Sequence, residues 1–248
     1  MTDKPNDKPK DKPTLDRIKI FADGASLPSM LESARDPRIS GFTTNPTLMR
    51  KAGISDYRAF AKEVLAAIKD RPISFEVFAD DTSEMRRQAR EIATWGTNVY
   101  VKIPVTNTKR EPTTELVREL AGAGVKLNVT AICTVAQVRE VARALEGGAP
   151  SVVSVFAGRI ADTGRDPIPL MQESLSICRA AGKSVELLWA SPRELLNIVQ
   201  AAEIGCDIIT VTPDLLKKLE LVGKDLGDFS LETVQMFFRD AEAAGFKL

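Results

Sequence analysis

Two ionisable residues lie inside apolar segments of this chain, where charged side chains are uncommon. Lys102 lies in the string NVYVKI and Glu76 in the string ISFEVF. An isolated ammonium is costly to bury, and burial disfavours the charged form of a lysine. A neutral amine can attack a carbonyl carbon and form a Schiff base, which then acts as an electron sink. The residues therefore indicate covalent chemistry on a carbonyl, although a lysine reaching the rim or a structural Lys102–Glu76 ion pair fits equally well.

Other polar residues follow apolar segments and suggest a charged substrate. Asp23 ends the string IKIFAD, where it could also cap the next helix, and Arg159 lies in FAGRIAD. Ser191 and Arg193 form a second cluster further along the chain, where Ser191 followed by Pro192 predicts the start of a helix. Guanidinium groups bind phosphate bidentately, and a helix N-terminus adds backbone donors. We therefore predict an anion site, with two surface arginines in weak salt bridges as the alternative.

Composition removes several classes of function. The chain of 248 residues contains no histidine, which excludes Ser-His-Asp and Cys-His catalysis and any histidine-ligated metal. Its three cysteines lie far apart, so we expect free thiols and no zinc site. Basic and acidic residues number 34 each, so no nucleic-acid surface is expected. Without an apolar run of about 18 residues or a signal peptide, we expect no membrane contact and a cytoplasmic protein.

Short apolar runs alternate with longer amphipathic segments along the chain. Several runs are rich in Val, Ile and aromatic residues, as strands buried on both faces should be. Eight such units predict an α/β fold, a closed (β/α)8 TIM barrel, with its site at the carboxyl ends of the strands. No glycine-rich nucleotide motif follows the first run. The runs cover residues 18–22, 40–43, 73–78, 98–103, 126–130, 151–156, 184–190 and 207–211.

The two ends of the chain differ from the repeating pattern. Residues 1–15 are a Lys/Asp/Pro-rich segment, which we expect to be a disordered tail. Residues 16–248 are expected to form a single barrel domain. That domain includes an extra amphipathic helix over residues 230–246, which we expect to pack on the barrel or on a neighbouring subunit.

Eight strings of this sequence resemble the transaldolase family, in the order in which the family carries them. They cover about residues 18–218 and read FADGA, GFTTNPTL, SFEVFAD, YVKIPVT, LNVTAI, SVFAGRIAD, LWASPRELLN and DIITVTPDLL. The resemblance implies a barrel of the class I aldolase type, with Lys102 as the Schiff-base lysine. It also implies catalytic roles for Asp23, Glu76 and Thr130, the last near a catalytic water.

The resemblance further implies a set of substrate-binding residues. The residues that match the family's substrate contacts are Thr43, Asn45 and Asn128. Those that match the lining of the donor-sugar pocket are Ser154 and Phe156. Those that match the phosphate contacts are Arg159, Ser191 and Arg193.

The reaction implied by the family is transfer of a dihydroxyacetone unit from a ketose phosphate to an aldose. The donor would be sedoheptulose 7-phosphate or fructose 6-phosphate, as in the pentose phosphate pathway. No metal or cofactor is expected. The partners would be sugar phosphates and further copies of the chain, in a dimer or in the pentamers and decamers of the short family members.

The sequence leaves three alternatives open. The chain is close in length to the short forms, which include fructose-6-phosphate aldolase, a lyase. Glu76 favours transaldolase, because the corresponding position of that aldolase resembles a glutamine. The pocket of that aldolase also has a tyrosine where Phe156 stands here. Differences around Trp189 would also fit a transaldolase acting on a modified sugar, such as a sulfo-sugar or a polysaccharide precursor. A barrel without catalysis is the third alternative, and the intact Asp23, Glu76 and Lys102 speak against it.

Overall fold

Eight parallel strands close into a barrel in the computed structural model, which describes residues 15–247. Each strand pairs with the next along the chain, and β8 closes the ring by pairing with β1. The predicted (β/α)8 barrel is therefore confirmed. The strands are β1 (Lys19–Asp23), β2 (Ile39–Thr43), β3 (Ile73–Glu76), β4 (Val99–Pro104), β5 (Leu127–Ile132), β6 (Ser151–Val155), β7 (Val185–Trp189) and β8 (Ile208–Val211).

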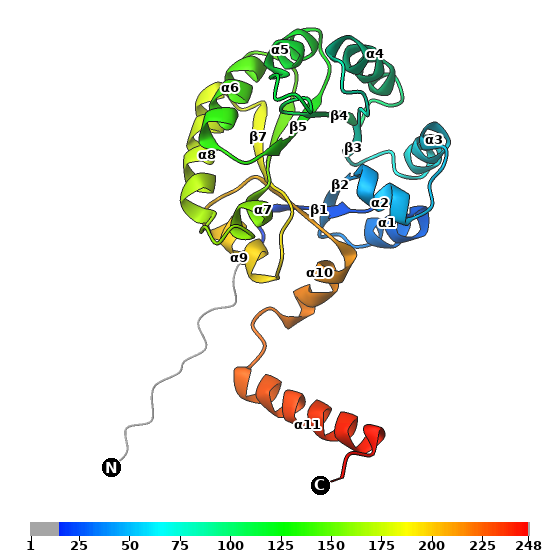
Figure 1. Ribbon diagram of the computed structural model, residues 1–248, viewed down its shortest axis with the longest axis vertical. Helices are drawn as coiled ribbons and strands as arrows, with labels where there is room; N and C mark the ends of the chain where they lie inside the picture. The colour runs from blue at the N-terminus through cyan, green and yellow to red at the C-terminus, as the bar shows by residue number, and fades with distance from the viewer. Residues whose placement is uncertain (1–14, 248) are drawn as a thin grey trace.

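Helices surround the strands on the outside of the ring (Figure 1). They connect consecutive parallel strands, as the crossovers of a barrel must. Around the barrel lie α1 (Leu27–Ala34), α2 (Pro46–Lys51), α3 (Tyr57–Ala67), α4 (Thr82–Ala93), α5 (Thr114–Gly122), α6 (Val135–Leu145), α7 (Ala157–Ala161), α8 (Ile168–Ala181) and α9 (Leu196–Glu203). After β8 follow α10 (Pro213–Lys217), the 3-10 helix η1 (Lys218–Leu221) and α11 (Leu226–Ala244).

The strands separate two apolar cores by their period of two. Outward side chains such as Val99 and Val101 of β4 pack under the helices in the larger core. A smaller cluster lies inside the barrel and holds Phe21, Val152, Leu188, Ala190 and Ile208, with Tyr100 and Phe156 against it. The cluster extends from the middle of the barrel to Phe156 and Ala190 beside the carboxyl-end cavity, so the inward polar side chains of that end lie above an apolar floor.

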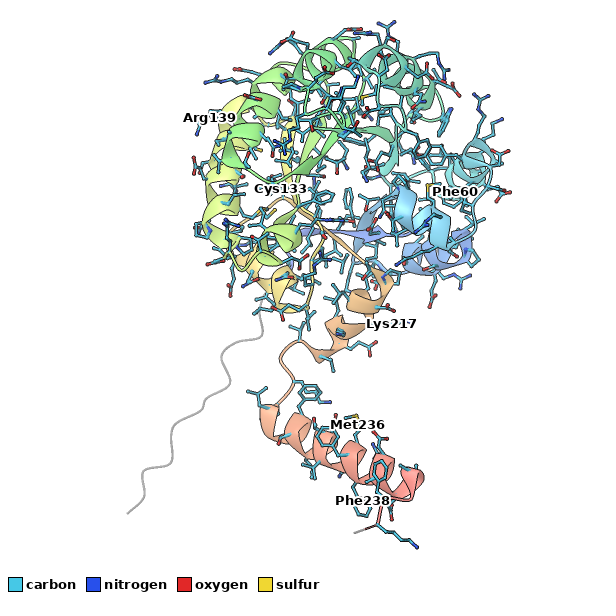
Figure 2. All side chains as sticks on the ribbon, viewed as in Figure 1. Phe60, Cys133, Arg139, Lys217, Met236 and Phe238 are labelled. Atoms are coloured by element: carbon cyan, nitrogen blue, oxygen red, sulfur yellow. The ribbon has the colours of Figure 1, made fainter. Side chains whose placement is uncertain are left out.

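The C-terminal helix stands apart from the barrel. The predicted helix over residues 230–246 is observed as α11, which begins four residues earlier because Asp225 caps it and accepts from the Asp228 amide. None of its residues is buried, and Figure 2 shows Met236 and Phe238 on a helix that lies clear of the ring. The expected packing on the barrel is therefore absent within this chain. Residues 15–247 contain no helix that combines the length and the apolar character needed to cross a membrane.

The tail predicted for residues 1–15 lies outside the described residues except for Leu15. The division into a tail and one domain, residues 16–248, stays a prediction.

Gly158 allows α7 to approach the segment after β7. Its amide donates to the carbonyl of Ala190, with N and O 3.3 Å apart. A Cβ atom at this position would lie 1.5 Å from the carbonyl oxygen of Ser191. Only glycine therefore fits between the two segments that carry Arg159, Ser191 and Arg193.

Replacing Gly158 by alanine is expected to destabilise the fold, because the clash is with backbone that cannot rotate away. We expect Gly158→Ala to lower the free energy of unfolding by about 3 kcal/mol or more, measured by urea denaturation. Gly122→Ala is the control, since an added Cβ there meets nothing within 4 Å. It should be neutral or stabilising by up to about 1 kcal/mol. Equal effects of the two substitutions would contradict the packing argument.

Candidate active site

A cavity of about 430 Å³ opens at the carboxyl ends of the strands and collects every site residue predicted from the sequence. These residues come from different strands and from the segments that follow them. The predicted residues in its lining are Asp23, Thr43, Asn45, Glu76, Lys102, Asn128, Thr130, Ser154, Phe156, Arg159, Ser191 and Arg193.

Lys102 and Glu76 form an ion pair deep in this cavity. The two residues are register partners on β4 and β3, so their inward side chains are neighbours. Lys102 Nζ lies 3.2 Å from Glu76 Oε2, and the two side chains are only 8% and 17% exposed. Lys102 Nζ also donates to the carbonyl oxygen of Thr44 at 2.7 Å. The lysine therefore does not reach the rim, and its nearest carboxylate can accept its proton.

Asp23 lines the same cavity, close enough for Lys102 to influence its pKa, and is held by two polar side chains. Thr43 Oγ1 donates to Asp23 Oδ1 at 2.9 Å, and Asn45 Nδ2 donates to Asp23 Oδ2 at 3.2 Å. Burial raises the pKa of Asp23 above its usual value, while Lys102 and these donors oppose the shift. Asp23 does not cap α1, whose N-cap residue is Ser26. The carboxyl group can therefore carry a proton at a higher pH than an exposed aspartate.

Asn45 serves two purposes in the same place. Its Oδ1 accepts from the Leu48 amide at 2.9 Å and so caps α2, which begins with Pro46. That bond fixes the orientation of the amide and leaves Nδ2 pointing to Asp23. The hydrogen bond that caps α2 therefore also directs the Asn45 amide nitrogen into the cavity.

A row of small polar side chains continues the cavity wall from β3 to β6. Asn128 Nδ2 donates to Ser74 Oγ at 3.0 Å, and Ser154 Oγ donates to Asn128 Oδ1 at 2.6 Å. Asn128 is the register partner of Lys102, so both side chains point into the interior of the barrel. Thr130, two residues further along β5, faces the same cavity. This wall offers hydroxyl and amide groups to a polyhydroxylated ligand.

The arginines lie toward the exposed part of the cavity, and one of them is already paired. Arg193 Nε donates to Asp162 Oδ1 at 3.0 Å, and a second guanidinium nitrogen pairs with Oδ2. Arg193 holds the pKa of Asp162 below its usual value. No ion pair of Arg159 is found within residues 15–247. The cavity therefore has cationic groups at its outer end, one of which shares its charge with a carboxylate.

The helix N-terminus expected beside Ser191 is absent. Helix α9 begins only at Leu196, and the amides of Arg193 and Glu194 donate to Asn197 Oδ1 at 2.8 and 3.2 Å. Ser191 has a φ of 61°, a left-handed conformation that few non-glycine residues adopt. An anion bound here would therefore have to rely on side chains more than on helix donors.

Several residues of the site were not predicted from the sequence. Thr210 Oγ1 shares a hydrogen bond with Thr43 Oγ1, and Thr212 also lines the cavity. Thr210 interrupts the apolar run of β8, the same signal that identified Lys102, so the sequence could have revealed it. Asp162 follows Arg159 in the string FAGRIAD. Across the described part of the chain, no three Cys, Asp or Glu side chains gather as a metal ligand set.

Comparison with known families gives this cavity a context. The sequence model of the family Transaldolase/Fructose-6-phosphate aldolase matches residues 20–248. The chain belongs to this family. The predicted resemblance is confirmed, and membership of the transaldolase family supports a transferase enzyme over a barrel without catalysis.

Individual members of the transaldolase family give the same result. A probable transaldolase of Dehalococcoides mccartyi is 37% identical over 202 residues, which cover 82% of this chain and 90% of that protein. A probable transaldolase of Thermoanaerobacter sp. is 36% identical over 231 residues, 93% of this chain and all of that protein. The family name implies sugar phosphates as the class of substrate.

Solved structures outside the transaldolase family share the fold. A dihydrodipicolinate synthase of Rhodopseudomonas palustris aligns with a TM-score of 0.53 at 17% identity, over 81% of this chain and 71% of that one. An HpcH/HpaI aldolase/citrate lyase family protein of Burkholderia cenocepacia aligns with a TM-score of 0.57 at 15% identity, over 88% and 95%. At such low identity these matches support the barrel fold alone.

The raised pKa of Asp23 has a consequence for stability. A carboxyl group whose pKa is higher in the folded than in the unfolded protein costs folding free energy once it ionises. We therefore expect Asp23→Asn to gain melting temperature relative to the unmodified protein as the pH rises from about 4 toward 8. Thermal melts at a series of pH values measure this difference.

Asp36 supplies a control of opposite sign. Its hydrogen bonds with Arg38 lower its pKa, so ionised Asp36 stabilises the fold above about pH 4. Asp36→Asn should therefore have a lower melting temperature than the unmodified protein throughout about pH 5 to 8, by a small and nearly constant amount, because the effect of the lowered pKa is complete above about pH 4 and the pair is at the surface. A pH-independent difference for Asp23→Asn would contradict the assigned shift.

Proposed function

We propose that this chain transfers a dihydroxyacetone unit from fructose 6-phosphate or sedoheptulose 7-phosphate to an aldose through a Schiff base on Lys102. The observation that carries the proposal is the buried lysine whose Nζ lies 3.2 Å from the Glu76 carboxylate, inside a cavity at the carboxyl ends of the strands. Hydroxyl and amide groups around it suit a sugar chain, and Arg159 and Arg193 suit its phosphate.

The first step of the proposed reaction joins the donor to Lys102. The neutral Nζ attacks the C2 carbonyl carbon of the ketose, after Glu76 or a water molecule has taken the ammonium proton. Loss of the C2 oxygen as water then gives the protonated Schiff base. The amine is held for this attack by the carbonyl oxygen of Thr44, which orients Nζ at 2.7 Å.

The second step breaks the C3–C4 bond. Glu76, acting through a water molecule held by Thr130, removes the proton of the C4 hydroxyl group, and C4 becomes the aldehyde carbon of the first product. The electron pair of the broken bond moves into the Schiff base and gives an enamine on Lys102. Asp23 and Asn45, which are hydrogen-bonded to each other, would bind the hydroxyl groups of this three-carbon adduct.

The third step reverses the chemistry with a different aldehyde. The enamine carbon attacks the carbonyl carbon of the acceptor aldose, whose oxygen takes a proton from the same relay. Water then hydrolyses the Schiff base and frees Lys102. The exchange is thereby divided into two covalent half-reactions, each with a lower barrier than direct transfer.

The main alternative is an aldolase that releases free dihydroxyacetone. The carboxylate of Glu76 and the apolar ring of Phe156 favour the transferase, since the residues of the lyase at the corresponding positions resemble glutamine and tyrosine. A place in the pentose phosphate pathway and a cytoplasmic location belong to the same proposal. A transaldolase acting on a modified sugar is a further alternative, suggested by the differences around Trp189.

Borohydride reduction in the presence of fructose 6-phosphate tests the covalent step. We expect a three-carbon adduct on Lys102, identified by peptide mass spectrometry, and no adduct in Lys102→Ala. Lys19→Ala is the control, because Lys19 also lies on a barrel strand but lines a cavity at the opposite mouth. An adduct on another lysine, or none with any ketose phosphate, would remove the proposed mechanism.

The same incubations separate the transferase from the lyase. With erythrose 4-phosphate present we expect glyceraldehyde 3-phosphate to appear at least tenfold faster than without it, about 1.4 kcal/mol in barrier height. Equal rates with and without the acceptor would identify an aldolase.

We also propose that α11 packs on a neighbouring copy of the chain, in a homo-oligomer such as a dimer, pentamer or decamer. The helix has 19 residues, none of them buried, and large exposed apolar surfaces are typical of protein contacts. Its exposed apolar side chains are Leu226, Phe229, Leu231, Val234, Met236, Phe237 and Phe238.

Light scattering after size exclusion tests the role of α11. We expect a mass several times that of the 27.1 kDa chain, and a smaller mass for the double variant Phe237→Asp, Phe238→Asp. Arg239→Asp changes a charge on the same helix without removing apolar surface and should leave the mass unchanged. A monomeric unmodified protein would contradict the proposal.

A further inference from the structure

Strands β2 and β3 separate before β3 ends. Their pairing stops at Thr43 with Ser74, and the Thr44 amide makes one more bond to the carbonyl of Ser74. The chain then turns into α2 at Pro46. Glu76 therefore has no partner strand on its β2 side, although on the other side Val77 N donates to the Lys102 carbonyl. An unpaired backbone edge leaves an amide and a carbonyl to be satisfied by another group.

The hydroxyl group of Tyr57 occupies the place of the missing strand. The amide of Glu76 donates to Tyr57 Oη at 2.7 Å, and Tyr57 Oη donates to the carbonyl oxygen of Glu76 at 3.2 Å. A phenol can accept and donate at once, so one atom satisfies both backbone groups. Burial raises the pKa of Tyr57, which keeps its proton on the oxygen.

The ring of Tyr57 is itself fixed. Tyr57 is the first residue of α3, behind the N-cap Asp56, whose side chain accepts from the Ala59 amide. Its ring makes edge contacts with Phe75, Phe78 and Trp95, with centroids 6.0, 4.5 and 5.6 Å away. The hydroxyl group is therefore held by a helix start and an aromatic cluster, both outside the cavity.

We propose that Tyr57 is a positioning residue for Glu76, which fixes the backbone from which the carboxylate reaches Lys102. The inference rests on the proposed function, because it assigns Glu76 a proton-transfer role there. The same strand separation leaves the Thr44 carbonyl free to accept from Lys102 Nζ. Tyr57 and Thr44 thus hold the two members of the ion pair from the gap between β2 and β3.

A change of the Tyr57 hydroxyl group alters the position of Glu76 without altering the charges around it. The ionisable groups that face Glu76 are Lys102 from β4, Asp23 from β1 and Tyr57 itself from α3. Removing a neutral hydroxyl group leaves the net charge of this set as it was. A shift in the pH dependence of kcat would therefore report the placement of Glu76.

Tyr57→Phe keeps the ring and removes the two hydrogen bonds. We expect kcat for transfer from fructose 6-phosphate to fall about tenfold or more, because small displacements of a proton-transfer group are costly. KM should change less than about twofold, since Tyr57 does not line the cavity. The pH dependence of kcat should change, and the Glu76 amide should exchange with D2O several-fold faster.

Tyr100→Phe is the matched control. Tyr100 is the other tyrosine of the chain, on β4 with Lys102, and it lines the cavity at the opposite mouth. No hydrogen bond of its hydroxyl group is found within the described residues. We expect kcat, the pH profile and the Glu76 amide exchange to stay as in the unmodified protein.

The outcomes separate this inference from the proposed function. An unmodified protein without transfer activity overturns the function, and amide exchange then decides whether Tyr57 holds Glu76. An active protein whose kcat and pH profile are unchanged by Tyr57→Phe overturns the positioning role alone. If Tyr57→Phe does not fold, Phe78→Ala removes a half-exposed ring against Tyr57 and should lower kcat in the same direction; unchanged kcat there also overturns the role.

Discussion

The contact between Lys102 and Glu76 is the constraint that the rest of the site depends on. A buried ion pair loses hydration that its mutual attraction often fails to restore, so it is weak support for stability. Lys102 Nζ has a further partner in the Thr44 carbonyl, and the Tyr57 hydroxyl group holds the backbone that carries Glu76. Asp23 adds a second carboxyl group that burial makes harder to ionise. The arrangement is therefore better explained by reactivity than by stability.

The barrel can hold this polar set because its interior is divided into two levels. Residues on one face of a strand recur every second position, so β4 turns both Tyr100 and Lys102 inward. Tyr100 packs against the apolar cluster around Phe21, whereas Lys102 lies one step nearer the carboxyl end, in the cavity. A shift of one residue in any strand would exchange inward and outward faces. Register is thus the structural basis of the site.

Much of this was predictable from the sequence. Eight apolar runs gave the barrel, and a charged residue inside an apolar run located Lys102 and Glu76. The role of Tyr57 and of the Thr44 carbonyl could not be predicted, because both depend on where two strands separate and on backbone atoms that every residue carries. The helix donors expected beside Ser191 are absent, since Asn197 takes the available amides. These contacts depend on how distant segments of the chain meet in the fold, which residue type alone does not predict.

The pair between Arg193 and Asp162 bears on how an anionic substrate would be selected. Both side chains are about half exposed, so their attraction is worth only about 0–1 kcal/mol. A phosphate dianion brings more charge and more acceptor oxygens than one carboxylate, and forms stronger charge-assisted hydrogen bonds with a guanidinium group. It could therefore replace Asp162 on Arg193, whereas an uncharged sugar could not. On the proposed function, Asp162 would pair with Arg193 until a substrate phosphate displaces it. A neutral sugar could not displace Asp162, so the pair would favour phosphorylated substrates.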